Sequence, residues 1–507
     1  MAKTKNQTLK GTGMKYKGSD SASVIDKIKV YGQKNTVYAR KGNDQITVYK
    51  GSKHKIYGGD GKDKINLTKD VGEKITVDGG AGNDKITISG GGSYSNHKIK
   101  GGAGNDTITV AKGNSVMRAK FYGDKGNDKF IVNAGIQHTF NGGAGADTFK
   151  INGGGAHTIN TGGSKGTKKY DRVYIGKNYS SSVTVNGGAQ KDYVEILNGS
   201  GHVINTKGGN DVIKIGSAKQ RITSARYKIN LGAGHDKLTA TNLVTVNVED
   251  GAGNDTITIS KAGSANITAG AGKNNISLSE VDYAYIYSTG EKAENKITIS
   301  GGDYNHVSGF SNSKTGSKNI ITINGGNNHT VSGNVGSDVI EVNGGSGHQI
   351  NIGSRNAFGD TVTVNKGNNI SVELSSDTSN NKAILKGGNT TLTCWNKSSD
   401  TIHVYFSGKE KNSVAINYKS YNGVGTSGGV YSPGDSTHKK LILHGLSNYS
   451  VNFDKNDSKS VGGILEIKSG GSSLTMDHWR CVTKIYDISV AGADGKLQPW
   501  KEQSKYV

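Results

Sequence analysis

The sequence predicts an all-β fold, a right-handed parallel β-solenoid of about 18 coils with a C-terminal β cap. One observation behind this prediction is a nine-residue phrase that recurs along the chain. The other is composition: only 32% of the 507 residues are hydrophobic and 77 are glycine, too little apolar mass for one large globular core. A solenoid needs only a few inward-facing residues in each coil. Disorder is the alternative for so polar a sequence, but disordered chains do not keep a strand period.

The recurring phrase combines a glycine pair, a third glycine, an aspartate and a β-branched residue. It reads GGDGKDKIN at 58–66, GGAGNDKIT at 79–87, GGAGNDTIT at 101–109, GGAGADTFK at 142–150 and DGAGNDTIT at 250–258. The glycines allow a tight turn with positive φ, and the β-branched residues begin a strand. A spacing of 19 to 25 residues, typical of one solenoid coil, separates the key residues Asp44, Asp63, Asp84, Asp106, Asp128, Asp147, Asp171, Asp192, Asp211, Asp236, Asp255, Asn274, Asn295, Asn319, Asp338, Asp360, Asn381 and Asp400.

Short alternating segments follow the phrase. Ile-Thr-Ile or Ile-Thr-Val stands at 86–88, 108–110, 257–259 and 297–299. Successive side chains of a strand point to opposite faces, so the outer two residues point inward and the middle one faces water. We therefore expect two strands in each coil, joined by the aspartate turn on one side and by a different, polar turn on the other.

The phrase resembles the GGxGxDxUx nonapeptide repeat of the RTX (haemolysin-type) calcium-binding family. The resemblance covers roughly residues 30–410 and implies a calcium-binding β-roll that leaves the cell by type I secretion. RTX rolls usually carry two such motifs in each coil, whereas this chain carries one, so calcium is expected along one edge only. The positions that match the metal ligands of the family are Asp44, Asp63, Asp84, Asp106, Asp128, Asp147, Asp211, Asp236 and Asp255.

The aspartates also have a structural interpretation, in which they only cap turns by hydrogen bonds to their own backbone. Calcium takes six to eight oxygen ligands, and carboxylates stacked about 5 Å apart would repel one another without a cation between them. We therefore predict calcium along this column. Between residues 273 and 330 asparagine takes the key position, and there we expect a calcium-independent ladder of side-chain amides. Metal binding stays open for the imperfect loops at Asp171, Asp192, Asp338, Asp360 and Asp400.

A second column is expected at the other turn of the coil. Asn35 and Asn368 are expected to fill the same slot as its histidines, an exchange that favours a neutral imidazole bonded to the turn backbone over a transition-metal site. Stacked neutral histidines should make the fold sensitive to acid. The histidines assigned to this column are His54, His97, His138, His157, His202, His306, His329 and His348.

The chain carries a formal net charge of +22, spread over outward strand positions and loops. This charge suits either a well-solvated surface or adhesion to anionic polymers such as acidic polysaccharide or lipopolysaccharide. No aromatic platform for nucleic-acid bases is evident, so sequence-specific nucleic-acid recognition is not expected. Tyrosine is the commonest aromatic residue, with 23 copies, and could contact sugars.

Four regions are expected. Residues 1–30 form an N-terminal arm and cap, 31–410 the solenoid, 411–439 a Gly/Ser-rich irregular loop region, and 440–507 a C-terminal β cap that would carry the type I secretion signal. The last region resembles the segment that follows RTX rolls in its LEI at 465–467, LTMDHW at 474–479 and Asp-Gly at 494–495. No apolar leader and no transmembrane segment is predicted. Cys394 and Cys481 are expected to stay unpaired rather than form a disulfide.

No nucleophile elbow, zinc-binding HExxH helix or phosphate-binding loop occurs in the sequence, so catalysis is not expected. The function we expect is that of a secreted calcium-binding structural protein, outside the cell or on its surface. It would fold on calcium and self-associate to build or anchor extracellular (biofilm) matrix, surface layer or filaments. The alternative is a monomeric adhesin for anionic polysaccharide. Ice binding through the outward threonines is disfavoured because that column is interrupted at Lys150, Tyr174, Glu195, Lys214 and Glu341.

Overall fold

A computed structural model describes most of the chain. The described residues are 3–90, 95–113, 115–163, 170–177, 179, 181–217, 222, 226–290, 293–309, 318–333, 336–352, 359–374, 380–395, 400–406, 412–419, 439–444, 450–454, 464–469, 472–476, 486–491 and 496–500. Their regular elements are all β-strands, and they form a parallel β-solenoid of about 17 coils. The all-β solenoid that the sequence predicts is therefore confirmed. Within the described part of the chain, no helix has the length and apolarity that crossing a membrane would require.

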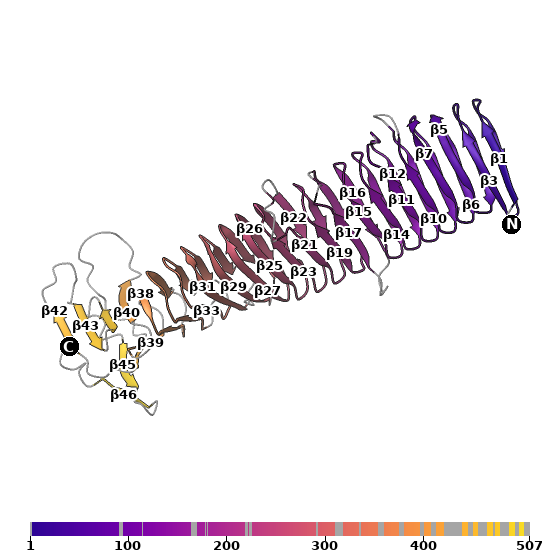
Figure 1. The fold of residues 1–507 in the computed structure, drawn as a ribbon. Coiled ribbons are helices and arrows are strands. Elements are labelled where there is room, and N and C mark those ends of the chain that lie inside the picture. Colours follow the sequence, from indigo (N-terminus) through magenta and orange to yellow (C-terminus); the bar gives the residue numbers. More distant parts are fainter. Residues whose placement is uncertain are drawn as a thin grey trace. The chain divides into compact units, whose positions relative to one another are not determined.

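The chain divides into two compact units, Met1–Gly251 and Ala252–Val507. In each unit every coil contributes one strand to a first sheet and one strand to a second sheet, and Figure 1 shows these strands as successive arrows in chain order. Each strand pairs in parallel with the equivalent strand of the next coil, as in Lys64↔Lys85 and Ile65↔Ile86.

The first unit begins its stacking at once, because β1 pairs with β3 in parallel; residues 1–30, expected as an arm and cap, thus contain stacked strands. The first sheet of this unit comprises β1 (Lys3–Leu9), β3 (Val24–Val30), β5 (Gln45–Gly51), β7 (Lys64–Val71), β9 (Lys85–Ile88), β11 (Thr107–Val110), β13 (Lys129–Val132), β15 (Thr148–Ile151), β17 (Asp171–Ile175), β19 (Asp192–Ile196), β21 (Val212–Ile215) and β23 (Lys237–Thr241). The second sheet comprises β2 (Lys15–Lys17), β4 (Thr36–Lys41), β6 (Lys55–Asp60), β8 (Thr76–Ala81), β10 (Lys98–Ala103), β12 (Lys120–Lys125), β14 (Thr139–Ala144), β16 (His157–Gly162), β18 (Val183–Asn186), β20 (Val203–Asn205), β22 (Arg226–Asn230) and β24 (Thr245–Glu249).

The second unit repeats this arrangement. Its first sheet comprises β25 (Thr256–Ala262), β27 (Lys273–Val281), β29 (Glu294–Asp303), β31 (Lys318–Asn327), β33 (Val339–Val342), β35 (Thr361–Val364), β37 (Lys382–Leu385), β39 (Thr401–Tyr405), β41 (Lys439–His444), β45 (Tyr486–Ala491) and β46 (Leu497–Pro499). Its second sheet comprises β26 (Ser264–Ala269), β28 (Ala284–Ser288), β30 (His306–Gly309), β32 (Thr330–Gly333), β34 (Gln349–Ile352), β36 (Ile370–Leu374), β38 (Gly388–Trp395), β40 (Asn412–Lys419), β42 (Ser450–Asp454), β43 (Ile464–Ser469) and β44 (Ser472–Met476).

Among the described strands, antiparallel pairing occurs near the C-terminus. Strand β43 is antiparallel to both β42 and β44, and β46 is antiparallel to β45. These strands form the predicted C-terminal β cap, and the LEI segment at 465–467 lies within it. Residues 477–479 of the LTMDHW segment and the Asp-Gly turn at 494–495 lie outside the described residues.

The core of each coil follows the predicted alternation. In β9 Ile86 and Ile88 are fully buried whereas Lys85 is exposed. In the core, like residues of successive coils stack on one another: the rings of Phe130 and Phe149 stack with centroids 4.8 Å apart. Phe140 of the second sheet meets Phe130 edge to face at 5.7 Å, so the two sheets share one narrow interior. Such ladders bury each apolar side chain against its neighbours without needing a large core.

Two turns complete a typical coil, and a buried polar residue often stands at the end of each turn, where the next strand begins. The turn from the second sheet into the first ends on aspartate directly before the strand, as at Asp84 before β9; we call it the aspartate corner. The turn from the first sheet into the second often ends on histidine, as at His97 before β10; we call it the histidine corner.

Candidate functional site

The structure places all nine predicted calcium ligands at the aspartate corner. None is more than 2% exposed, although each is a potential charge. Eight belong to the first unit and Asp255 to the second. Burial of this kind requires a partner for each carboxylate, because an ionised group loses its hydration on burial.

Half of each carboxylate is satisfied by the neighbouring coil. The Oδ1 atom of Asp84 accepts a hydrogen bond of 2.7 Å from the backbone N–H of Asp63, and Oδ1 of Asp106 accepts one of 2.7 Å from that of Asp84. The same bond joins Asp26 to Asp44 at 2.7 Å, and it continues through most of the first unit. The aspartate therefore binds the turn of the preceding coil, whereas the structural interpretation of the sequence had it capping its own turn.

At eight of the buried aspartates of this column the other carboxylate oxygen, Oδ2, has no such bond. The Oδ2 atoms without a hydrogen-bond partner, all buried, include those of Asp44, Asp63, Asp84, Asp106, Asp128, Asp147, Asp211 and Asp338. In a folded protein such atoms are uncommon. Each therefore marks a position where a proton or a cation is expected.

A glycine makes room for this oxygen. A Cβ atom on Gly79 would overlap both Oδ2 of Asp84 and the carbonyl oxygen of Gly101 in the next coil. Gly58 stands in the same relation to Asp63 Oδ2 and to the carbonyl oxygen of Gly79. The first glycine of each pair is thus required by close approach of two oxygen atoms, one from a carboxylate and one from the adjacent backbone.

Burial changes the protonation of the column. Loss of hydration raises the pKa of Asp84 to about 7, and the charge of Asp106 adds to this. Burial, together with Asp171 and Asp128, raises the pKa of Asp147 to about 8. Burial disfavours the charged form of a carboxylic acid. The column therefore binds either protons or a positive ion more readily than exposed aspartates do.

The possible metal-ligand atoms at the aspartate corner are of the type that calcium prefers. They are oxygens only, from carboxylates and glycine carbonyls, and hard cations prefer such ligands. Among the described residues no three His, Cys, Asp or Glu side chains converge on one point. Calcium here would therefore draw on the carboxylates of neighbouring coils, with backbone carbonyls supplying most of the remaining ligands.

The column of buried aspartates extends beyond the nine predicted calcium ligands. Asp26, which sequence reasoning missed, is fully buried and bonds the Ser19 N–H at 2.8 Å and the Tyr16 hydroxyl at 3.1 Å. It follows no glycine-rich phrase, so only its distance from Asp44 could have revealed it. At Asp171 the free oxygen is taken by Gln190 Nε2 at 2.6 Å. The aspartates of the imperfect loops share the buried position, namely Asp171, Asp192, Asp338, Asp360 and Asp400.

The asparagine section forms the predicted amide ladder. Asn274 Nδ2 donates to Asn295 Oδ1 at 3.1 Å, Asn295 Nδ2 to Asn319 Oδ1 at 3.1 Å, and Asn319 Nδ2 to Asp338 Oδ1 at 3.0 Å. This section needs no cation, because an amide supplies both donor and acceptor.

The histidine column is confirmed at most of its positions. Nδ1 of His54 accepts the N–H of Asn35 at 3.1 Å, and Nδ1 of His138 accepts that of Ala119 at 3.2 Å. Nε2 of His54 lies 3.2 Å from the Lys50 carbonyl. Since Nδ1 accepts, the proton of these neutral rings sits on Nε2. The same Nδ1 contact occurs at His97, His157, His202, His329 and His348.

Two assignments to this column were wrong. Asn305, not His306, occupies the slot, because the N–H of Asn305 bonds His329 Nδ1 at 3.2 Å while its Oδ1 accepts the N–H of Ala284 at 2.8 Å. His306 pairs with Tyr285 on the outward face of β30. At the other position Ile370 follows His348 in register, and Asn368 pairs with Ser346 in the preceding turn.

One of the two cysteines lies in the described part of the chain. Cys394 is buried and unbridged, and Cys481 lies outside the described residues. No protein-family model, no curated protein and no solved structure matches this chain; the resemblance to RTX repeats therefore rests on the sequence motif alone.

Proposed function

We propose that this chain is a structural protein whose solenoid is stabilised by calcium bound along the aspartate corner. The observation that carries the proposal is the row of buried Oδ2 atoms without hydrogen-bond partners; those of Asp63, Asp84, Asp106, Asp128 and Asp147 each lie next to a glycine that leaves no room for a side chain. Protons alone would satisfy these atoms incompletely at neutral pH, because the pKa of Asp63 and of Asp84 is about 7. A divalent cation would let the carboxylates ionise while remaining buried.

Calcium would then act as a switch for folding outside the cell. A cation that binds only the folded form stabilises it by mass action, so low calcium would leave the coils loose and millimolar calcium would close them. This fits export by type I secretion, as the resemblance to RTX repeats implies. A long repetitive fold also suits a building block of matrix, surface layer or filament, with self-association through strand edges or coil ends.

The test is urea unfolding of the full chain, followed by circular dichroism, in millimolar calcium and in chelator. We expect calcium to raise the free energy of unfolding by about 3 kcal/mol at a concentration near 100 times the dissociation constant. Magnesium should raise the free energy of unfolding by less, because it demands regular octahedral geometry. Equal stability in calcium and in chelator would contradict the proposal.

A pair of variants locates the effect. Asp63→Asn with Asp84→Asn keeps an Oδ1 acceptor, as Asn274 does for the N–H of Asp255 at 3.0 Å, but removes the charge that holds calcium. The matched control is Asp60→Asn with Asp70→Asn, two exposed aspartates of the same region. The calcium response should fall in the first variant and persist in the second. The reverse result would place the calcium elsewhere.

A second candidate function is binding of anionic polysaccharide, and it is favoured by the outward rows of lysine. Lys64 and Lys85 are register partners on the first sheet, and Lys98 and Lys120 on the second. All four are exposed, so adjacent coils present positive charge side by side. Retention on immobilised polygalacturonate but not on a neutral glucan, lost on raising the salt concentration, would support it. Filaments seen by electron microscopy in calcium would favour the structural role.

A further inference from the structure

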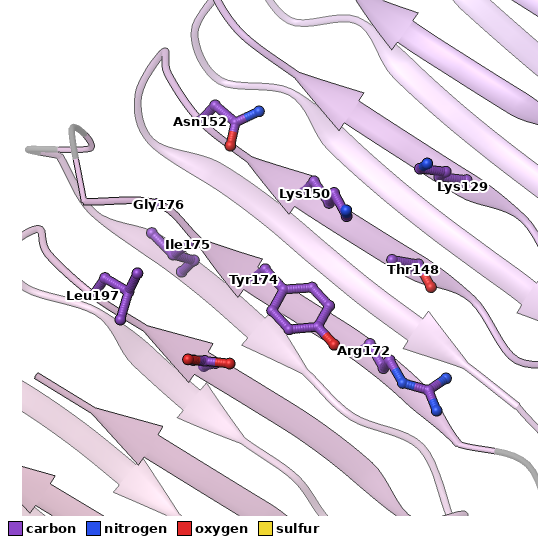
Figure 2. Close-up of a pocket in the computed structure, with 10 residues that line it drawn as sticks. Lys129, Thr148, Lys150, Asn152, Arg172, Tyr174, Ile175, Gly176 and Leu197 are labelled. Atoms are coloured by element: carbon purple, nitrogen blue, oxygen red, sulfur yellow. The ribbon is translucent and has the colours of Figure 1, made fainter. Parts of the chain in front are cut away.

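A groove of about 620 Å³ opens on the outer face of the first unit's first sheet. Its lining comes from strands β13, β15, β17 and β19 and from the residues that follow them, as Figure 2 shows. Elsewhere along this sheet, side chains of successive coils stack on one another, as Tyr31 does on Tyr49 with ring centroids 4.8 Å apart. The groove is a local break in such stacking.

A missing side chain creates the break. Asn152, Gly176 and Leu197 follow the three stacked strand ends Ile151, Ile175 and Ile196, so they occupy equivalent places in successive coils. Gly176 stands between two residues with side chains and leaves the space between them empty. Its φ is not in the left-handed region, and the nearest atom to a Cβ placed on it would be Asn152 Oδ1 at 3.4 Å. The backbone does not require glycine here.

Positive charge surrounds this space. Lys129, Lys150 and Arg172 all line the groove, and Lys129 and Lys150 are exposed. Within the described part of the chain, neither lysine forms an ion pair. Arg172 is held over the ring of Tyr170, with its guanidinium carbon 3.9 Å from the ring centroid. A bound anion would meet cations that have no competing carboxylate partner.

An aromatic ring forms part of the floor. Tyr174 lies in register between Lys150 and Glu195, and Figure 2 shows its ring face-on beside Lys150 and Thr148. Such a ring offers the apolar face of a sugar a flat surface, while its hydroxyl stays available for a polar contact. Glu195 accepts a hydrogen bond of 3.0 Å from the Tyr193 hydroxyl, which fixes a carboxylate beside the ring.

We propose that this groove binds an acidic saccharide, a proposal that rests on the second candidate function and names its site. A sugar ring lies on Tyr174, its carboxylate is bound by Lys150 together with Lys129 or Arg172, and Glu195 accepts a hydrogen bond from a hydroxyl. This combination matches the few well-placed polar groups of a ligand pocket. Glu195 favours a ligand that carries hydroxyl groups over a polyphosphate backbone, since its carboxylate accepts hydrogen bonds from hydroxyls and a polyphosphate offers none to donate.

The experiment is isothermal titration of the full chain with trigalacturonate, and with maltotriose as the neutral trisaccharide. The buffer contains no added calcium, because uronates bind that ion themselves. Lys150→Met removes one charge and should weaken trigalacturonate binding roughly tenfold, the loss of one charge-assisted hydrogen bond. Lys296→Met, at an exposed site on β29 in the second unit, is the control and should bind like the parent chain.

Gly176→Gln fills the groove without backbone strain and should abolish binding, whereas Tyr174→Phe should retain most of it. Circular dichroism of each variant verifies the fold. Equal affinity for maltotriose, or tighter binding of a single-stranded oligonucleotide, would overturn the assignment of the ligand. If the parent chain binds but Lys150→Met and Gly176→Gln bind equally well, this site is wrong although the second candidate function survives. Absence of binding by the parent chain to trigalacturonate and to polygalacturonate would refute both.

Discussion

At the aspartate corner a carboxylate Oδ1 accepts the backbone N–H of the preceding coil, and at the histidine corner an imidazole Nδ1 accepts the equivalent N–H on the other side of the same coil. The bonds are similar: 2.7 Å from Asp63 N–H to Asp84 and 3.2 Å from Ile75 N–H to His97. Both side chains are buried. Both corners also contain a glycine with no room for a Cβ, as at Gly79 beside Asp84 and at Gly135 beside His138. Each corner thus satisfies an N–H that the sheet itself leaves unpaired.

The two corners differ in their response to protons. Burial is the main cause at both, but it raises the pKa of Asp84 to about 7 and lowers that of His97 to about 4. Both shifts favour the uncharged form. The uncharged imidazole of His97 accepts a backbone N–H at Nδ1, and its buried Nε2 has no hydrogen-bond partner. An uncharged carboxyl, by contrast, exists only by holding a proton, and it becomes an anion when that proton leaves. The aspartate corner is therefore the one that can exchange its proton for a cation.

Asparagine shows what the two corners share. It occupies the histidine slot at Asn35 and Asn305 and the aspartate slot at Asn274 and Asn381, and in each place its Oδ1 accepts a backbone N–H. The geometric requirement at both corners is therefore a short side chain with an acceptor atom. Only the aspartate corner adds a side chain that can carry a negative charge.

The largest effect is expected from filling the space beside a corner carboxylate. Gly79→Ala forces a methyl group against Asp84 Oδ2 and the carbonyl of Gly101, and overpacking of this kind should lower the free energy of unfolding by about 3 kcal/mol. Urea unfolding measures it. Gly325→Ala is the control, since no atom lies within 4 Å of a Cβ placed there, and it should be nearly neutral. A neutral Gly79→Ala would refute the close approach of the two oxygens.

The next effect is a loss of stability in acid at the histidine corner. Burial, with the neighbouring His157 and His97, lowers the pKa of His138 to about 3. The unfolded chain binds a proton near pH 6.5, so this contribution to stability is present above about pH 6.5 and is lost as the pH falls towards 3. We expect a loss of roughly 2 kcal/mol from this residue by about pH 4.5. The measurement is urea unfolding as a function of pH.

A variant separates the effect of protonating His138 from that of the other residues that titrate in acid. His138→Asn removes the titration but keeps the acceptor, as Asn305 does naturally. It also loses the edge contact with Phe121 at 5.4 Å, so it should be less stable at neutral pH. Its further loss between neutral and acid pH should nevertheless be smaller than that of the parent chain. An identical acid loss in both would show that His138 is not responsible.

A smaller effect should follow from placing charge in the amide ladder. Asn295→Asp removes Nδ2, which donates to Asn319 Oδ1 at 3.1 Å and to Ser288 Oγ at 2.6 Å. The loss of these two bonds between buried groups should destabilise the second unit by about 1–3 kcal/mol. The melting temperature in chelator tests this. Recovery in calcium would show that an aspartate alone suffices to create a site; no loss in chelator would contradict the ladder.

The smallest effect is expected for His54→Asn. The neighbouring coil already carries Asn35 in this slot, where its Oδ1 accepts the Met14 N–H at 2.8 Å, so the exchange should change the free energy of unfolding by less than about 1 kcal/mol. His54→Leu is the matched variant without an acceptor. It should cost more, because the Asn35 N–H would be left without its partner. Equal stability of the two would mean that the bond to Nδ1 contributes little.

Much of the candidate site follows from the repeat itself. The glycine-rich phrase, its period and the isoleucine alternation give the turn, the strand and the buried position of Asp84 and its equivalents, since all are local or nearly local properties. The errors arose at positions where the register between coils decides which residue occupies a slot. Asn305 and His306 both fit the sequence pattern, and only pairing with Ala284 and His329 selects Asn305. Ile370 displaces Asn368 for the same reason.

The amino-acid sequence by itself determined that this chain winds into stacked parallel coils with aspartate at one turn and histidine at the other, because a short repeat carries its own turn and strand chemistry. Only the tertiary structure decided what those side chains contact. The donor to each Asp Oδ1 lies one coil away, and the groove at Gly176 exists because Asn152 and Leu197 stack on either side of it. Contacts between coils depend on register, which no single repeat encodes.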